Sequence, residues 1–354
     1  MKKHLIAIAL AGTFAVSANA QNVTLSGLLD HGVAHQDNGS TTFTGTRGNM
    51  ASTSNLKVNV TEDLGGGLRF TGLLTQEFNI TDGQHSDSSA TTAADYSQPG
   101  GSSNGRATNS FQETSMALSH ADWGSIKIGH FGLASRDASG VGRFGGNLGR
   151  LTSAIRTNGD AVDGAIEYTT PKLGNMVTLS IANANQAAAA ASATAPTDSG
   201  FFARFDMGPL SAAVGQTKRD YGLTTGDNVE TVIGAQYDAG FARFGLVRGT
   251  DNGASASSTN TSLSRLTATT GQALVPIGNG LSILAGMQKI KNTASTVDAS
   301  GYTLSLRKEL SKRTMVQLYT DSLDNKGTVL VSTYTTGVAG KRTSNTGVNV
   351  SHSF

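Results

Sequence analysis

The sequence lacks cysteine altogether and has only five prolines among 354 residues. Without cysteine the chain forms no disulfide and no thiolate metal site, and catalysis by a thiol is excluded. No apolar run of about 18 residues follows residue 20, so the sequence predicts no membrane-spanning helix there. Hydrophobic residues other than glycine make up 37% of the chain, and glycine is abundant, with 44 residues. The absences exclude a disulfide scaffold and disfavour a helical membrane protein.

The first 20 residues have the three zones of a secretory signal peptide. A start with two lysines precedes an apolar run over 5–16, and the small residues Ala18 and Ala20 follow. The apolar run is too short to span a bilayer, which disfavours the alternative of an N-terminal anchor. We therefore expect Gln21 to become the mature N-terminus. The expected organisation is a signal peptide, 1–20, and one β-barrel domain, 21–354.

Charge is balanced once the signal peptide is set aside. Two of the 27 basic residues lie in it, which leaves 25 basic and 25 acidic residues. A nucleic-acid-binding protein normally carries a basic patch on one face, and no such patch is evident. We expect no nucleic-acid partner.

The dominant pattern is alternation of apolar and polar residues, which is typical of strands with two unlike faces. Between residues 55 and 61, for example, Leu56, Val58 and Val60 alternate with polar residues. Sixteen such strands are predicted, near 23–35, 54–63, 68–80, 109–120, 124–131, 164–171, 175–183, 200–207, 209–218, 229–238, 240–249, 263–274, 280–290, 301–310, 313–322 and 345–354.

The connections between these strands alternate in length. Short turns are expected at 64–67, 121–123, 172–174, 208, 239, 275–279 and 311–312. Long polar segments are expected near 36–53, 81–108, 132–163, 184–199, 219–228, 250–262, 291–300 and 323–344. Short turns at one end and long loops at the other indicate an outer-membrane barrel, and sixteen strands are enough to enclose an aqueous channel. The fold class is therefore all-β: a 16-stranded antiparallel transmembrane β-barrel.

Four segments carry a family resemblance. They are the mature start at 21–30 (QNVTLSGLLD), the first hairpin at 61–68 (TEDLGGGL), the late motif at 310–314 (LSKRT) and the end at 348–354 with its terminal Phe354. In this order and spacing the sequence resembles the trimeric Gram-negative porins of the β-proteobacterial type. The resemblance implies a homotrimer in the outer membrane, with the third long loop folded inward to narrow each lumen.

The function that follows is passive diffusion of small ions and hydrophilic solutes, with no enzymatic activity, cofactor or metal. The expected partners are outer-membrane lipid and lipopolysaccharide, and the barrel-assembly machinery, which such barrels engage through a terminal aromatic such as Phe354. Three alternatives remain: a porin selective for one anion or nutrient, an outer-membrane barrel enzyme, and a secreted β-adhesin. Two weak motifs are set aside, because the glycines of 140–145 lack the strand and helix of a nucleotide site, and His31 and His35 lack a third ligand.

The sequence departs from the family at its basic positions. The family usually carries arginine or lysine at the positions of Asn55, Asn59, Gln112 and His130, and after the third loop at those of Ala161 and Glu167. The barrel should tolerate these changes. The basic wall of the family is weakened, so we expect only weak anion selectivity.

The third long loop, 132–163, is the segment expected to set selectivity, because charges at a constriction focus the field on passing ions. It carries a formal charge of +1 from Arg136, Arg143, Arg150, Arg156, Asp137, Asp160 and Asp163. On the barrel wall, alternation points Lys57, Lys127 and Arg307 inward, since a charge facing lipid near the midplane would cost about 2–4 kcal/mol.

Overall fold

The computed structural model describes residues 19–81, 111–146, 161–185, 197–220, 227–252, 266–292, 298–325 and 340–354. They form a closed antiparallel β-barrel, and one short helix, α2 (Ala134–Gly140), lies in the described part of the third long connection. No described helix has the length and apolar character needed to cross a membrane. The strands are β1 (Asn19–Asp37), β2 (Thr42–Gly48), β3 (Asn55–Gly65), β4 (Leu68–Glu77), β5 (Glu113–His120), β6 (Gly124–Phe131), β7 (Val162–Thr169), β8 (Val177–Asn185), β9 (Thr197–Met207), β10 (Leu210–Asp220), β11 (Asn228–Asp238), β12 (Arg243–Asp251), β13 (Leu266–Gly278), β14 (Leu281–Asn292), β15 (Asp298–Glu309), β16 (Thr314–Asn325) and β17 (Arg342–Ser353).

Alternation along the strands separates an exposed outer face from a lumen face. On β11, Ile233 is 54% exposed while its neighbour Val232 is fully buried, and on β12 Leu246 is 53% exposed while Val247 is fully buried. Because successive strand residues point to opposite faces, the apolar side chains that remain exposed lie on the outside. All sixteen predicted strands overlap a strand of the structure, which confirms the fold class.

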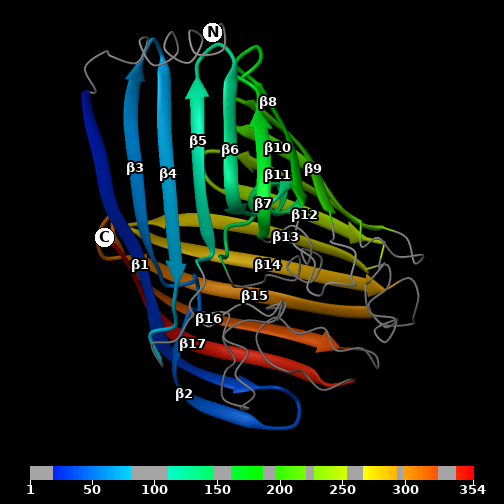
Figure 1. Cartoon of the computed structure of the whole chain (residues 1–354). Helices are drawn as coiled ribbons and strands as arrows, with labels where there is room; N and C mark the ends of the chain where they lie inside the picture. The colour runs from blue at the N-terminus through cyan, green and yellow to red at the C-terminus, as the bar shows by residue number, and fades with distance from the viewer. Residues whose placement is uncertain are drawn as a thin grey trace, which may run out of the picture.

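The barrel closes between the first and last strands. β1 pairs with β17 from Leu28 to Asp37, and Gly27 exchanges two backbone hydrogen bonds with the terminal Phe354. Figure 1 shows the C-terminus beside the middle of β1, so the N-terminal part of β1 extends beyond the end of the chain. Where β1 and β17 are paired the wall is closed, while the start of β1, before Gly27, is paired only with β3.

Seventeen strands occupy sixteen positions in the wall, because β2 and β3 share one. β2 pairs with the second half of β1, ending at His31 opposite Gly48, and β3 resumes on the first half, with Leu28 opposite Asn55. The six residues 49–54 therefore stand opposite only two residues of β1. Part of the long polar connection predicted over 36–53 is therefore a strand, β2, which the sequence did not predict.

The carboxylate of Asp30 holds this interruption in place. Its Oδ1 accepts hydrogen bonds from the backbone N–H groups of Met50, at 2.6 Å, and Ala51, at 3.1 Å. Its Oδ2 accepts hydrogen bonds from Asn349, at 2.9 Å, and Ser351, at 2.5 Å, both on β17. Asp30 is fully buried, so the full set of partners is what makes a carboxylate tolerable there.

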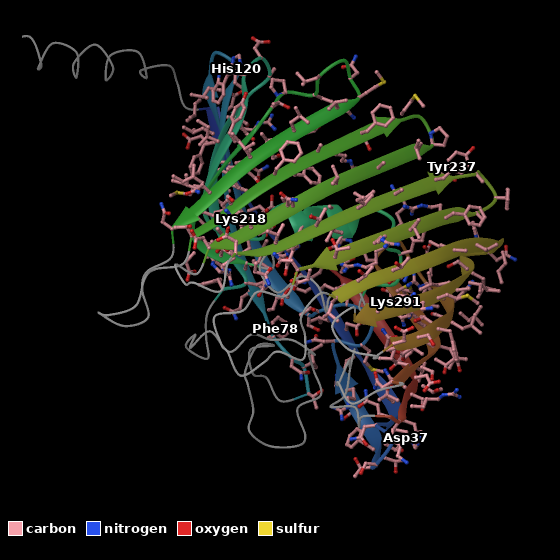
Figure 2. All side chains as sticks on the ribbon, turned by 90° about the vertical axis from the view of Figure 1, so that its right-hand side faces the viewer. Asp37, Phe78, His120, Lys218, Tyr237 and Lys291 are labelled. Carbon is pink, nitrogen blue, oxygen red and sulfur yellow. The ribbon has the colours of Figure 1, made fainter. Side chains whose placement is uncertain are left out.

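The two ends of the barrel differ as the sequence predicts. Tight turns join β9 to β10 at Gly208 and β3 to β4 at 65–67, where the glycines have φ values from 53° to 83° that favour residues without a Cβ. The long connections lie at the other end. Figure 2 shows Lys218, next to a long connection, and Tyr237, next to a short turn, at opposite ends of the strands.

Candidate functional site

Helix α2 is seated against the lumen face of β9–β12. Figure 2 shows it behind these strands when the barrel is viewed from outside. Gly215, Gly234 and Gly245, one on each of β10, β11 and β12, face the helix, and a Cβ at any of them would overlap backbone oxygens within 134–142. Because these three residues have no Cβ, the backbone of the third loop can pack directly against the wall.

A buried hydrogen-bond chain fixes the start of α2 to the same wall. The backbone N–H of Ser135 donates to Thr217 Oγ1 at 3.2 Å, and that hydroxyl donates to Ser135 Oγ at 3.0 Å. Ser135 Oγ in turn donates to Glu230 Oε2 at 3.1 Å. All three residues are fully buried. Each of these bonds is costly to leave unmade, because the groups have no water to replace a lost partner.

Beyond α2 the loop continues around the inside of the barrel. The backbone N–H groups of Phe144 and Gly145 donate to Gln272 Oε1 of β13, at 2.6 and 3.2 Å. The guanidinium of Arg243 lies 4.7 Å from the centre of the Phe144 ring. Gly146 then lies so close to the carbonyl oxygen of Ala51 that a Cβ there would overlap it. The described part of the loop thus extends from β6 along the wall to the segment held by Asp30.

Charged side chains of both signs gather where α2 faces β5–β7. Lys127 of β6 and Glu167 of β7 are opposite each other in register, and Lys127 Nζ lies 2.9 Å from Glu167 Oε1. The same ammonium lies 3.9 Å from the centre of the Phe131 ring. Lys127 therefore has its charge compensated locally and its position fixed on two sides.

The side chain of Asp137 on α2 is exposed to the lumen and lies near Lys127 and Glu167. The protein around it displaces bulk water from the carboxyl, and this desolvation raises its pKa to about 6. The positive charge of Lys127 opposes the shift, the negative charge of Glu167 adds to it, and Arg136 and Glu113 make smaller contributions of opposite sign. The charge of Asp137 therefore changes within the range of pH that a channel experiment covers.

The other residues named from the sequence lie in several places. Lys57 faces the lumen from β3, opposite Thr75, and makes no ion pair with another residue of the described ranges. Arg307 faces the lumen from β15 near the short turns, opposite Gln317.

Asp163 and His130 form a pair at 2.7 Å. His130 is in register with Thr114, and both lie on the outer face that carries Met116 and Ile128. Three positions fall outside the described residues: Arg150, Arg156 and Asp160.

Sequence reasoning missed the wall residues that surround the loop. Glu230, Gln272 and Arg243 come from three strands, and nothing in the alternation of each strand distinguishes them from other lumen residues. Each of them contacts a different part of the third loop: Glu230 binds Ser135, Gln272 binds the backbone at 144–145, and Arg243 lies against the Phe144 ring. Across the described ranges, no group of three or more His, Asp or Glu residues is arranged to hold a metal ion.

Comparison with known proteins gives this arrangement a family. The sequence pattern that describes the Gram-negative porin family matches residues 7–328. The chain belongs to the Gram-negative porins. The outer membrane porin protein 32 of Delftia acidovorans is 31% identical over 258 residues, which cover 71% of this chain and 70% of that protein.

Solved structures share the porin fold. The anion-selective porin of Comamonas acidovorans superposes with a TM-score of 0.72 at 24% identity, over 95% of this chain and all of that chain. The trimer form of OmpT from Vibrio cholerae gives 0.64 at 12% identity, over 95% and 100% of the two chains. The predictions of family, fold, outer-membrane location and passive transport are confirmed. This porin is a channel, and the third loop with its facing wall is its candidate constriction.

Proposed function

We propose that this porin is a general diffusion channel for small hydrophilic solutes, with weak anion selectivity set by the third loop. The observation that carries the proposal is the ion pair between Lys127 and Glu167. A wall lysine whose charge is cancelled 2.9 Å away contributes little to the field along the pore. The loop is then left as the main source of charge at the constriction.

The balance of charges supports a weak preference. Arg136 and Asp137 are neighbours on α2 and offset each other, while Arg143 follows in the same loop. Lys57, which forms no ion pair among the residues that the structure describes, adds positive charge from the wall. Water in the pore screens these charges over about 10 Å at 0.1 M salt. The excess positive charge is small, and its effect should fade as salt concentration rises.

The similar porin of Comamonas acidovorans is anion-selective, which agrees with this sign. A porin selective for one solute would instead show saturation of conductance by that solute. The absence of catalysis is also part of the proposal, because the porin family and fold are those of a non-enzymatic channel.

We further propose that 1–20 are a cleaved signal peptide, that the chain assembles as a homotrimer and that Phe354 engages the assembly machinery. The apolar outer face of β1–β8 is suited to a subunit contact or to lipid, since Val23, Leu25, Ile166 and Ile181 are each at least 58% exposed. OmpT of Vibrio cholerae is described in a trimer form. N-terminal sequencing should give Gln21 as the first residue, and cross-linking in mild detergent should give a trimer.

Reversal potentials in a salt gradient test the selectivity proposal. Arg136→Ser or Arg143→Ser should shift the anion-to-cation permeability ratio toward cations, and Lys127→Ser should shift it less. The matched control is Arg313→Ser, in the short turn before β16. Arg47 is unsuitable as a control, because it lies in β2 and is only 8% exposed. If both loop variants keep the wild-type potential while Lys57→Ser moves it, the wall sets selectivity and the proposal fails.

A further inference from the structure

A row of polar and charged side chains crosses the outer face of six consecutive strands. Strand register places its members side by side from β12 to β17: Arg248, Thr269, Lys289, Ser300, Asp324 and Arg342. The arginines and Lys289 are exposed, while the preceding residue on β12, Val247, is fully buried on the lumen face. Lys291 continues the row on β14, opposite Asp298, and is labelled in Figure 2.

The row borders the apolar band of the outer face on the side of the long connections. One register step toward the short turns, the outer face carries Leu246, Met287 and Tyr302, which are 53%, 78% and 49% exposed. The next steps carry Leu304 and Leu306. Charges facing lipid are costly at the midplane and tolerated near the interface, and Tyr is enriched at that level. The row therefore lies at the height of the lipid headgroups.

The side chains of the row enclose a shallow groove of about 790 Å³. Small residues make its floor, since Gly271, Ser300 and Gly301 line it. Four cationic side chains surround it, Arg248, Lys289, Lys291 and Arg342, against the single carboxylate of Asp324. We call these lining residues the outer-wall groove.

Within the part of the chain that the structure describes, no ion pair within 4.0 Å and no side-chain hydrogen bond involves any of the four cations. Counting Asp298 beside Lys291, two acidic groups oppose four basic groups. The surplus is notable in a chain whose mature charge is zero. An anion is the ligand that such a surface binds.

The position of the groove identifies the side of the membrane. β12 ends at Asp251 and β17 begins at Arg342, so both adjoin long connections, and the short turns lie at the opposite end. In outer-membrane barrels the long connections are extracellular. The groove therefore faces the outer leaflet, whose lipid in Gram-negative bacteria is a phosphorylated glycolipid.

We propose that the outer-wall groove binds the phosphate groups of lipopolysaccharide, a role that rests on the outer-membrane location of this porin. The arginine and lysine side chains form charge-assisted hydrogen bonds with phosphate, and the hydroxyls of Thr269 and Ser300 add neutral ones. The acyl chains lie against the exposed apolar side chains of Met287 and Leu304. Charge and height both suit this ligand, whereas a neighbouring subunit would have to bring an acidic surface to the same place.

The test is binding of purified lipid A to the detergent-solubilised porin, measured by native mass spectrometry. The double variant Lys289→Ser with Lys291→Ser should bind bisphosphorylated lipid A about ten-fold more weakly than the wild type, since each lost charge-assisted bond weakens affinity. Arg248→Ser with Arg342→Ser should do the same. The matched control is Lys312→Ser with Arg313→Ser, which removes two cations at the short-turn end and should leave affinity unchanged.

Two further measurements keep the outcome unambiguous. Dephosphorylated lipid A should bind the wild type and the groove variants equally, because it lacks the phosphate groups that the four cations would bind. Since the chain has no cysteine, Ser300→Cys introduces a unique thiol. This thiol should be labelled in the assembled protein and should not form a disulfide between subunits.

Equal binding of bisphosphorylated lipid A by the wild type and both groove variants would overturn the proposal. A disulfide between subunits would also overturn it, by making the groove a contact between copies. Reversal potentials of the groove variants should equal those of the wild type, so failure here is separate from failure of the selectivity proposal.

Discussion

Lys127 and Glu167 form an ion pair of 2.9 Å on the lumen face, although a long connection separates their strands. Glu167 is only 8% exposed and Lys127 26% exposed, so the pair is partly shielded from the screening that weakens surface ion pairs. The two opposite charges cancel each other on the wall that α2 faces. Changing either partner should therefore alter the electric field in the pore.

Glu167→Gln should increase anion selectivity. The substitution removes one negative charge and leaves Lys127 uncompensated, so the anion-to-cation permeability ratio should rise by about two-fold at low salt. Reversal potentials measured in a salt gradient give the ratio. Glu62→Gln, on β3 and in register with Phe70 of the outer face, is the control and should change nothing. An unchanged ratio in Glu167→Gln would show that the pair lies outside the field felt by ions.

Gly215→Ala should displace the third loop from its seat. The added Cβ overlaps the carbonyl oxygen of Ala134, and such overpacking costs about 1–3 kcal/mol. The expected results are a changed single-channel conductance and a lower unfolding temperature. Gly271→Ala is the matched control on β13, because its Cβ would meet nothing within 4 Å. Equal behaviour of the two variants would mean that α2 does not rest on β10 in the membrane.

Selectivity should depend on pH through Asp137. Desolvation raises the pKa of this carboxyl to about 6, so the group is largely neutral at pH 5 and charged at pH 7.5. Loss of the negative charge on acidification should make the pore more anion-selective at pH 5 than at pH 7.5. Asp137→Asn should hold the acidic value and remove this part of the pH dependence. A variant with the full wild-type pH dependence would assign the titration to another group.

Phe354→Ser should reduce assembly of the barrel. The terminal residue and Gly27 exchange backbone hydrogen bonds of 3.0 and 3.1 Å, and the ring of Phe354 lies directly over Gly27. Loss of the ring removes a packing contact at the closing seam. Phe354→Tyr should preserve assembly, and Gly27→Ala should impair it because a Cβ there would overlap the ring. The measurement is the fraction of heat-modifiable protein, and a normal fraction in Phe354→Ser would contradict the prediction.

Alternation predicted the sixteen wall positions because each strand carries its own two-faced pattern. It missed β2, since Thr42–Gly48 holds only one phenylalanine among three threonines, two glycines and an arginine, and its pairing with β1 is what orders it. The six residues that follow depend on Asp30 and on the last strand, which no local pattern reveals.

The candidate site was less predictable for the same reason. The lumen face of Lys127 followed from alternation, but its partner Glu167 depends on the register between β6 and β7. The argument that charges point inward applies only near the midplane, and Lys289, close to the long connections, faces outward. Strand height in the membrane, rather than alternation, decides such positions.

The interrupted second strand places a constraint on the order of folding. Asp30 lies near the start of the barrel, yet two of its partners, Asn349 and Ser351, lie within the last six residues of the chain. Residues 49–54 therefore acquire their full set of contacts only when the final strand has joined the first. Gly146 of the third loop lies beside Ala51 in the same segment, so the innermost parts of the pore reach their final arrangement last, after the wall has closed around them.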